Sequence, residues 1–211
     1  MKKLTLLLMI AASSLAFAQT HFGVKAGYIN STLDWKDSPD TFWEDFTDFK
    51  SNSFFYVGGF AEHFVSKNWA LQGELLFTQV GGKTTVDLYD LVGNEIVQAG
   101  TMKVNYKYTQ IQVPISAKYY FINKFALSGG FNFAFNIDAK VKNNANFTAF
   151  PSGKIENART LNVNPFVGAE YHITQNLFAD ARYNFGFGYI NKDGADMRSS
   201  FFQIGLGYRF K

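Results

Sequence analysis

The 211-residue sequence contains no cysteine. Disulfides, thiolate metal sites and a lipid anchor on an N-terminal cysteine are therefore excluded. An excess of charge of one sign is missing as well. Once Lys2 and Lys3 at the start of the chain are set aside, 18 basic residues stand against 17 acidic residues. A net charge this close to zero gives no electrostatic footprint for nucleic-acid binding.

Long apolar runs are missing after the opening segment, MKKLTLLLMIAASSLAFAQT. That segment has a charged start, an apolar core that begins with Leu4 to Ile10, and an A-x-A cleavage site at Ala16-Phe17-Ala18. It predicts a secretory signal peptide over 1–18. The alternative, a membrane anchor, is disfavoured because the apolar run is short for a bilayer. We expect one mature domain over 19–211.

The mature chain is rich in aromatic residues and glycine. The sequence has 24 Phe, 11 Tyr and 3 Trp, and its 18 Gly stand against 4 Pro, which suits a chain of many strands. Mean hydropathy is −0.10. A mean hydropathy near zero, together with the absence of a long apolar run after the opening segment, excludes a helical membrane protein. A membrane β-barrel remains possible, because its strands alternate and window averages hide them.

The stretch Phe125 to Ile137, FALSGGFNFAFNI, alternates strictly. Period-two alternation predicts a strand with one apolar face. The bulky face carries Phe125, Leu127, Gly129, Phe131, Phe133, Phe135 and Ile137, and the other carries Ala126, Ser128, Gly130, Asn132, Ala134 and Asn136. Small, weakly polar residues suit the narrow lumen of a barrel, and bulky aromatics suit lipid. This pattern is typical of a transmembrane β-barrel.

Eight segments alternate in this way. They lie at about 21–30, 52–64, 69–78, 111–121, 125–137, 161–173, 177–188 and 202–210. The fold predicted is all-β: an eight-stranded antiparallel up-and-down transmembrane β-barrel. Its predicted location is the outer membrane of a Gram-negative bacterium.

Short and long connections alternate along the chain. Short turns are expected at 66–68, 123–124 and 174–176, and long connections at about 31–51, 81–102, 138–160 and 191–198. Short turns are typical of the periplasmic side, so we expect both termini to be periplasmic. The region Lys83 to Val104 alternates too, and we interpret it as a hairpin extending two strands beyond the membrane. A turn at Gly81-Gly82 would instead give ten strands.

Charged residues are expected on the inward faces of the strands. They are four basic and four acidic residues, all predicted in the periplasmic half: Lys25, Glu62, Glu74, Lys118, Glu170, Asp180, Arg182 and Arg209. A buried charge needs a partner or water, so we predict an internal salt-bridge network that plugs the lower lumen. It could serve packing and register alone, or form a gate for small solutes or protons.

The first long loop combines acidic and aromatic residues. Its aromatics are candidates for a contact surface: Trp35, Phe42, Trp43, Phe46 and Phe49. Phe42, Phe46 and Phe49 have helical spacing, and Ser38-Pro39 could begin a short amphipathic helix that folds them over the barrel rim. Alternatively they could face an outside partner. Cation binding by the loop carboxylates is disfavoured, since their spacing matches no EF-hand loop.

Motifs for enzymatic chemistry are scarce. The histidines His21, His63 and His172 all fall near predicted strand ends, away from the long loops. No arrangement of nucleophile and base is apparent. The sequence also shows no glycine-rich phosphate loop and no zinc-binding spacing. We therefore predict no catalytic residues, no metal and no cofactor.

Several segments resemble a known family of small outer-membrane β-barrels, often labelled porin family or PorT-like. They are HFGVKAGYI, FYVGGFAEHFVSKNWALQGELLFTQVGGK, YTQIQVPISAKYYF, NVNPFVGAEYHI and the closing FFQIGLGYRF. The resemblance covers the mature chain, and it implies an outer-membrane location without implying a biochemical activity. Such barrels usually end in an aromatic residue read by the assembly machinery, whereas here Phe210 precedes Lys211.

Three classes of function follow from these features. The first is a non-enzymatic barrel with a filled lumen that anchors extracellular loops. The second is a narrow porin for small solutes, and the third, suggested by the family label alone, is an accessory of a secretion or export system. The expected partners are outer-membrane lipids, the assembly machinery and an unknown extracellular molecule, with no nucleic acid and no second subunit. A soluble lipocalin-like carrier is the rival fold, and it would bury Phe131, Phe133 and Phe135.

Overall fold

The computed structural model describes residues 19–35, 49–144, 152–192 and 197–210, and every structural statement below concerns these residues. They contain no helix long and apolar enough to cross a membrane. The strands are β1 (Thr20–Trp35), β2 (Lys50–Phe64), β3 (Trp69–Val92), β4 (Glu95–Ile122), β5 (Phe125–Asn143), β6 (Gly153–Lys154), β7 (Leu161–His172), β8 (Leu177–Asn184) and β9 (Met197–Arg209).

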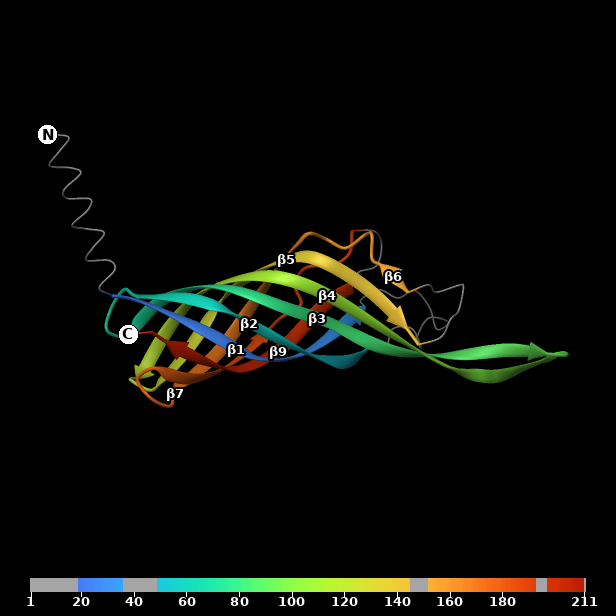
Figure 1. The fold of residues 1–211 in the computed structure, drawn as a ribbon, viewed down its shortest axis with the longest axis horizontal. Coiled ribbons are helices and arrows are strands. Elements are labelled where there is room, and N and C mark those ends of the chain that lie inside the picture. The colour runs from blue at the N-terminus through green and yellow to red at the C-terminus, as the bar shows by residue number, and fades with distance from the viewer. Residues whose placement is uncertain (1–18, 36–48, 145–151, 193–196, 211) are drawn as a thin grey trace, which may run out of the picture.

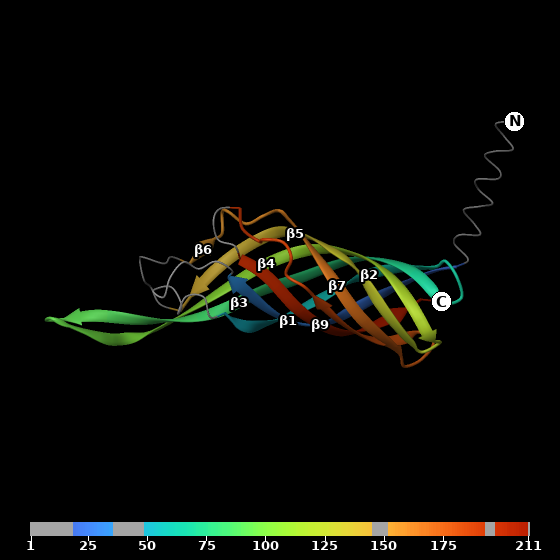
Figure 2. The same cartoon turned by 180° about the vertical axis from the view of Figure 1, so that it is seen from behind.

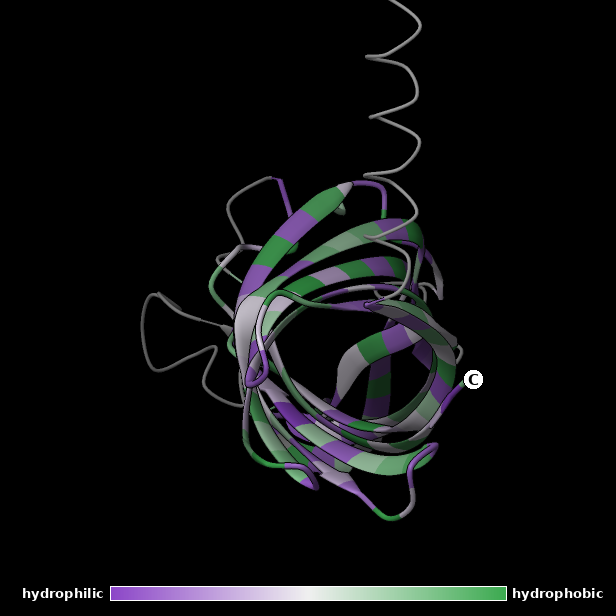
Figure 3. Ribbon diagram, turned by 90° about the vertical axis from the view of Figure 1, so that its left-hand side faces the viewer, coloured by the Kyte–Doolittle hydropathy of each residue, from purple (hydrophilic) through white to green (hydrophobic). Residues whose placement is uncertain are grey.

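Eight of these strands close into a ring. Neighbours pair antiparallel in the order β4-β3-β2-β1-β9-β8-β7-β5, and pairing of β4 with β5 completes the circle. The two-residue strand β6 pairs with β5 beside this ring. Viewed along its axis, the sheet encloses a central space (Figure 3). The predicted eight-stranded antiparallel barrel is therefore confirmed, and closure leaves no free sheet edge in the ring.

The side chains alternate as the sequence predicts. On β5, Phe131 is 55% exposed and Ile137 is 58% exposed, whereas Asn132 and Ala134 are fully buried. On β5, bulky residues thus cover the outer wall and small or polar residues face the lumen, whereas other strands also bury large aromatics such as Phe166 and Phe178. A lipocalin-like carrier would require the opposite arrangement, so this rival fold is wrong.

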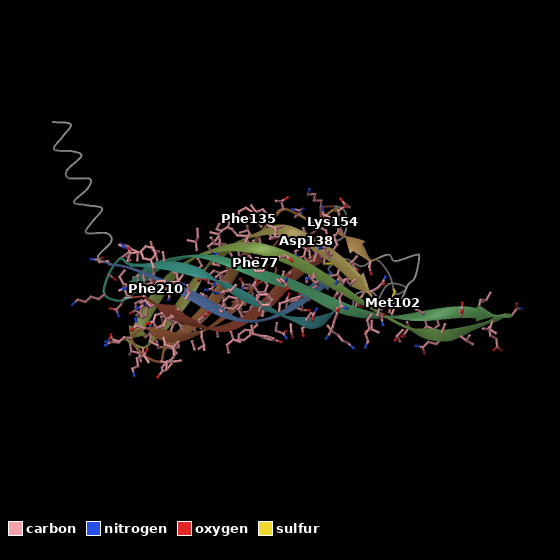
Figure 4. All side chains as sticks on the ribbon, viewed as in Figure 1. Phe77, Met102, Phe135, Asp138, Lys154 and Phe210 are labelled. Atoms are coloured by element: carbon pink, nitrogen blue, oxygen red, sulfur yellow. The ribbon has the colours of Figure 1, made fainter. Side chains whose placement is uncertain are left out.

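The outward apolar residues form a belt around the barrel. At one end, the Trp69 and Tyr119 rings lie 4.9 Å apart and the Tyr119 and Phe121 rings 4.8 Å apart. At the other end, the outward face of β3 changes from Leu75 and Phe77 to polar residues. Figure 4 shows Phe210 near the first edge of this belt and Phe77 and Phe135 toward the second. Aromatics at the edges of an apolar band are typical of a membrane barrel.

The two ends of the barrel differ. The turn end carries the short connections 65–68, 123–124 and 173–176, together with the start of β1 and the end of β9, where Phe210 N–H donates to the Phe22 carbonyl at 2.8 Å. The loop end carries the longer connections. The β3–β4 hairpin projects from the loop end far beyond the other strands (Figure 1, Figure 2).

The hairpin rules out the ten-stranded alternative. Gly81 and Gly82 lie within β3, opposite Lys107 and Tyr106 of β4. A Cβ atom added at Gly81 would lie 1.9 Å from the Tyr106 carbonyl oxygen. Glycine is thus needed here for close approach of two strands, not for a turn. The turn comes at Gly93-Asn94, and Gly93 has a φ of 67° that favours glycine.

Several predicted boundaries are wrong at the loop end. Strands β1 and β5 continue to Trp35 and Asn143, beyond the predicted ends near residues 30 and 137. Conversely, β8 stops at Asn184, although its alternation continues to Gly188. Phe185 N–H still bonds the Pro165 carbonyl in the β7–β8 register. Beyond it, Gly186 N–H donates to the Ser200 hydroxyl at 3.0 Å and Phe187 N–H donates to the Asn164 side-chain oxygen at 3.4 Å, so side chains replace the ladder. Alternation alone cannot distinguish a strand from an extended loop.

Candidate functional site

The lumen at the turn end holds all eight of the inward charges expected from the sequence. They come from β1, β2, β3, β4, β7, β8 and β9, that is, from every ring strand except β5. Seven are buried, and the Arg209 side chain is 13% exposed. We call this set the charge network: Lys25, Glu62, Glu74, Lys118, Glu170, Asp180, Arg182 and Arg209. Four positive and four negative charges make it neutral.

The first half of the charge network centres on Glu74. Its carboxylate accepts from Arg182 Nη2 at 2.5 Å and lies 3.2 Å from Lys25 Nζ. Lys25 also contacts Asp180 at 3.1 Å, and the Tyr56 hydroxyl donates to Asp180 at 3.2 Å. Every charge in this group thus has at least one opposite charge within reach, which offsets the cost of burying it.

The second half centres on Glu62 and Lys118. Glu62 accepts from Arg209 Nη2 and from the Tyr120 hydroxyl, each at 2.5 Å. Lys118 Nζ lies 3.1 Å from Glu62 and 2.7 Å from Glu170. His172 Nε2 lies 2.8 Å from the other Glu170 oxygen. The result is a chain of paired charges across the lumen.

Gln72 joins the two halves. Its carbonyl oxygen accepts from Lys118 Nζ at 2.9 Å, and its amide nitrogen donates to Glu74 at 2.7 Å. Gln72, Tyr56, Tyr120 and His172 were not among the candidate residues from the sequence. Gln72 and Tyr120 do share the inward phase of predicted network members, Glu74 and Lys118 respectively. Tyr56 lies on a strand with aromatics on both faces, so sequence alone could not orient it.

A layer of side-chain amides follows the charge network toward the loop end. We call it the amide layer: Gln110, Gln112, Asn132, Asn162, Asn164, Asn184 and Gln203, all at most 4% exposed. Asn184 is central, since it accepts from Asn132 at 3.1 Å and donates to Gln203 at 2.9 Å. Both polar side-chain atoms of Asn162 lack a hydrogen-bond partner among the described residues. Unpaired amide atoms of this kind make the layer suited to bound water.

An apolar cluster begins at the level of the amide layer, where Ile29 lies opposite Gln203 and Leu76 lies opposite Gln112, and it continues to the loop end of the lumen. We call it the apolar cap: Ile29, Leu33, Tyr56, Leu76, Val80, Tyr108, Ala139, Ile190, Met197 and Phe201. On β9, Arg209, Gln203 and Phe201 follow one another from the turn end, so one strand passes through all three layers. The apolar cap was not predicted from the sequence, although the inward phase of the strands contains Leu76 and Val80.

Two connections contribute to the apolar cap. Ile190, from the segment between β8 and β9, is 2% exposed, and its N–H donates to Met197 at 2.9 Å. Ile155 and Ala158, from the connection between β5 and β7, pack against the same cluster. Arg159 N–H donates to the Ile190 carbonyl at 2.8 Å and ties the two connections together. These described parts of the loops thus cover the barrel mouth.

The candidate contact surface of the first loop is described only in part. Phe42, Trp43 and Phe46 lie outside the described residues. Trp35 ends β1 opposite Met197, and its side chain is also outside the described part. Phe49 lies 5.6 Å from the Tyr106 ring and packs against the apolar cap. Phe49 therefore faces the barrel mouth.

The charge network offers little for catalysis. Its carboxylates are held between cations, and among the described residues no group of three or more His, Cys, Asp or Glu side chains could hold a metal ion. His21 and His63 lie on β1 and β2 at the turn end, where His63 contacts the Thr20 hydroxyl at 2.9 Å.

Residues 17–191 match the model of a family described as "Outer membrane protein beta-barrel domain". No match was found among curated proteins.

Solved structures with a similar fold are membrane barrels. Neisserial surface protein A has a TM-score of 0.54 at 16% identity, with 90% of this chain and 97% of that chain covered. Ail, the attachment invasion locus protein of Yersinia pestis, has a TM-score of 0.51 at 16% identity, covering 91% and 99%. The protease OmpT from Escherichia coli has a TM-score of 0.46 at 12% identity, with 90% of this chain and 96% of that chain covered. At these identities the likeness shows the fold alone.

Proposed function

The chain belongs to the outer-membrane protein β-barrel domain family, and from this premise we propose that it is a non-enzymatic anchor with a plugged lumen. The anchor holds the β3–β4 hairpin and the long loops outside the cell, and both termini lie in the periplasm. Short turns are typical of the periplasmic end of such barrels. In this chain the short turns lie at the same end of the barrel as the start of β1 and the end of β9.

One observation carries the proposal: the charge network, the amide layer and the apolar cap together occupy the lumen from the turn end to the loop end. A solute would have to break ion pairs of the charge network, cross the amide layer and displace the apolar cap. Removing one partner from a buried ion pair costs about 3–5 kcal/mol. That cost opposes conduction through the resting barrel, so the surfaces open to a partner are the hairpin and the loops.

Single-channel recording tests the plugged lumen. The mature protein, residues 19–211, is refolded, shown to be folded by heat-dependent migration on an unboiled gel, and inserted into planar bilayers. We expect no discrete current steps over a range of voltages. Reproducible steps from folded protein would overturn the proposal.

A narrow passage for small solutes is the second candidate function. The amide layer favours it, because the unpaired atoms of Asn162 and the neighbouring amides suit a hydrated space. In that case Arg182→Ala and Glu74→Ala would change conductance or ion selectivity, whereas Lys67→Ala at an exposed turn would not. Silence from all three variants would speak against a passage.

An accessory role in envelope export is a narrower hypothesis, implied only by the PorT-like resemblance. Purification of the protein from native membranes in mild detergent, followed by identification of bound proteins, would test it. Recovery of export components with the intact barrel, and their loss after removal of 86–102 from the hairpin, would favour that role.

A further inference from the structure

Seven lysines gather on one side of the barrel, on the outer wall beyond the apolar belt. We call them the lysine band: Lys50, Lys83, Lys103, Lys107, Lys140, Lys142 and Lys154, from β2 to β6. On β3 the alternation turns Phe77, Gln79 and then Lys83 to the same outer face. On β2 and β5 a register shift precedes the lysines, so that Lys50 lies opposite Lys83 and Lys140 lies opposite Lys107 on that face. Figure 4 shows Asp138 and Lys154 further toward the loop end than Phe135.

The strand register places like charges side by side. Lys107 lies directly opposite Lys140, and Lys140 lies directly opposite Lys154. Lys50 lies opposite Lys83 in the same way. Directly opposite residues have Cβ atoms about 4.5–5.5 Å apart, and like charges at that distance destabilise a sheet. An anion bound across the band would remove this repulsion.

The described acidic residues neutralise little of the lysine band. Asp138 pairs with Lys140 at 2.8 Å. Its hydrogen bond from Lys140 lowers the pKa of the Asp138 carboxyl, so this charge is present at neutral pH. No other described carboxylate lies within 4.0 Å of a band lysine. The band therefore keeps a surplus of positive charge.

A hollow in the wall lies within the lysine band. It has a volume of about 250 Å³ and is lined by Lys50, Lys83, Thr84, Thr85, Lys103 and Asn105. One water takes about 30 Å³ in the liquid, so the hollow has room for a phosphate group. Three lysines and two threonines are among its lining residues, and their ammonium and hydroxyl groups match phosphate oxygens, for which lysine serves as a point charge.

We propose that the lysine band binds the phosphate groups of anionic lipid headgroups in the leaflet at the loop end. This inference rests on the proposed membrane placement. Lys107 lies four residues beyond Ile111 of the belt, about 10 Å along the membrane normal for a rise of ~3.3 Å per residue and a tilt of ~40°. Its flexible stem can lie along apolar surface and place the ammonium among the headgroups.

Lipid A, a lipid with two phosphates on a disaccharide, is a suitable probe. Refolded residues 19–211 in neutral detergent micelles are titrated with lipid A or with the same lipid after dephosphorylation, and binding is followed by native mass spectrometry. We expect the phosphorylated form to bind more tightly. A lysine near an anionic surface contributes about fivefold in affinity, so the triple variant K83Q/K107Q/K140Q should weaken binding on the order of 100-fold.

The matched control is K67Q/K124Q/K192Q, which removes three exposed lysines outside the lysine band. Equal binding of the two lipid forms, or equal effects of the two triple variants, would overturn the inference. Inorganic phosphate that competes as well as lipid A at equal concentration would assign the site to free phosphate and overturn the lipid source.

Two further outcomes separate the competing explanations. The chain's own acidic segment is a competing partner for the lysines, and its charge is removed by changing five residues to amides: Asp37, Asp40, Glu44, Asp45 and Asp48. If lipid A binds only after this change, that segment is the partner of the lysines and the inference is overturned. The unboiled-gel test on vesicles reports the membrane placement independently. If the barrel inserts but binds both lipid forms equally, only the inference about the lysine band is wrong. If the barrel fails to insert, the proposed function on which that inference rests is wrong as well.

Discussion

At the residue scale, Glu74 is the centre of the first half of the charge network. It is buried, and its two oxygens contact Lys25 and Arg182. Lys25 keeps Asp180 as a second partner, whereas Glu74 is the one carboxylate of the described residues within 4.0 Å of Arg182. Loss of the Glu74 charge would therefore leave a buried guanidinium unpaired, which is much more costly than loss of an exposed pair.

Glu74→Gln should lower the free energy of unfolding by about 3–5 kcal/mol. Asp138→Asn is the matched control, because it breaks an exposed pair with Lys140 and should cost about 0–1 kcal/mol. Urea unfolding of both variants in lipid vesicles, followed by tryptophan fluorescence, measures the difference. Equal losses for the two variants would contradict the charge network as a stabilising unit.

The residues of the charge network could be predicted from the sequence, but their pairing could not. Alternation fixes which face a side chain occupies, so Lys118 and Glu170 were expected to point inward. Which carboxylate meets which cation depends on the stagger of the strands around the ring, and no local pattern encodes that stagger. For the same reason Gln72 did not stand out as the link between Lys118 and Glu74.

At the scale of elements, the β3–β4 hairpin decides the strand count. Gly81-Gly82 resembles a turn in sequence, yet both residues stay in the ladder with Lys107 and Tyr106. Close backbone approach, which sequence patterns do not distinguish from a turn, is the physical cause. The early end of β8 at Asn184 also depends on contacts that local alternation does not show, since the N–H groups of Gly186 and Phe187 bond the side chains of Ser200 and Asn164 instead of a neighbouring strand's backbone.

Gly81→Ala should destabilise the barrel by roughly 1–3 kcal/mol, because the new methyl group meets the Tyr106 carbonyl oxygen and the strands must shift. Gly73→Ala lies on the same strand, where an added Cβ meets nothing within 4 Å, and should change stability by less than about 0.5 kcal/mol. The temperature at which the folded band disappears from an unboiled gel compares them. A Gly81 variant as stable as the Gly73 variant would show that the contact relaxes without cost.

At the scale of the whole molecule, each strand of the barrel serves two surfaces. One face of the strands forms the outer apolar belt, and the other face carries the charge network, the amide layer and the apolar cap. A closed barrel in lipid satisfies its backbone within the ring, so its function depends on the lumen and on what extends beyond the membrane. Here the lumen is occupied by the charge network, the amide layer and the apolar cap. The β3–β4 hairpin and the lysine band lie at the loop end, and therefore orientation decides which compartment they meet.

The absence of cysteine makes this orientation measurable. Asn94→Cys places one thiol at the hairpin turn, and Asn123→Cys places one at the turn end. On intact cells, a membrane-impermeant maleimide should label the Asn94 variant and leave the Asn123 variant unlabelled until the outer membrane is permeabilised. Both turns are exposed, so accessibility within the fold is matched. If only the Asn123 variant were labelled on intact cells, the orientation would be the reverse of the proposed one. The hairpin would then lie in the periplasm and the lysine band at the inner leaflet of the outer membrane.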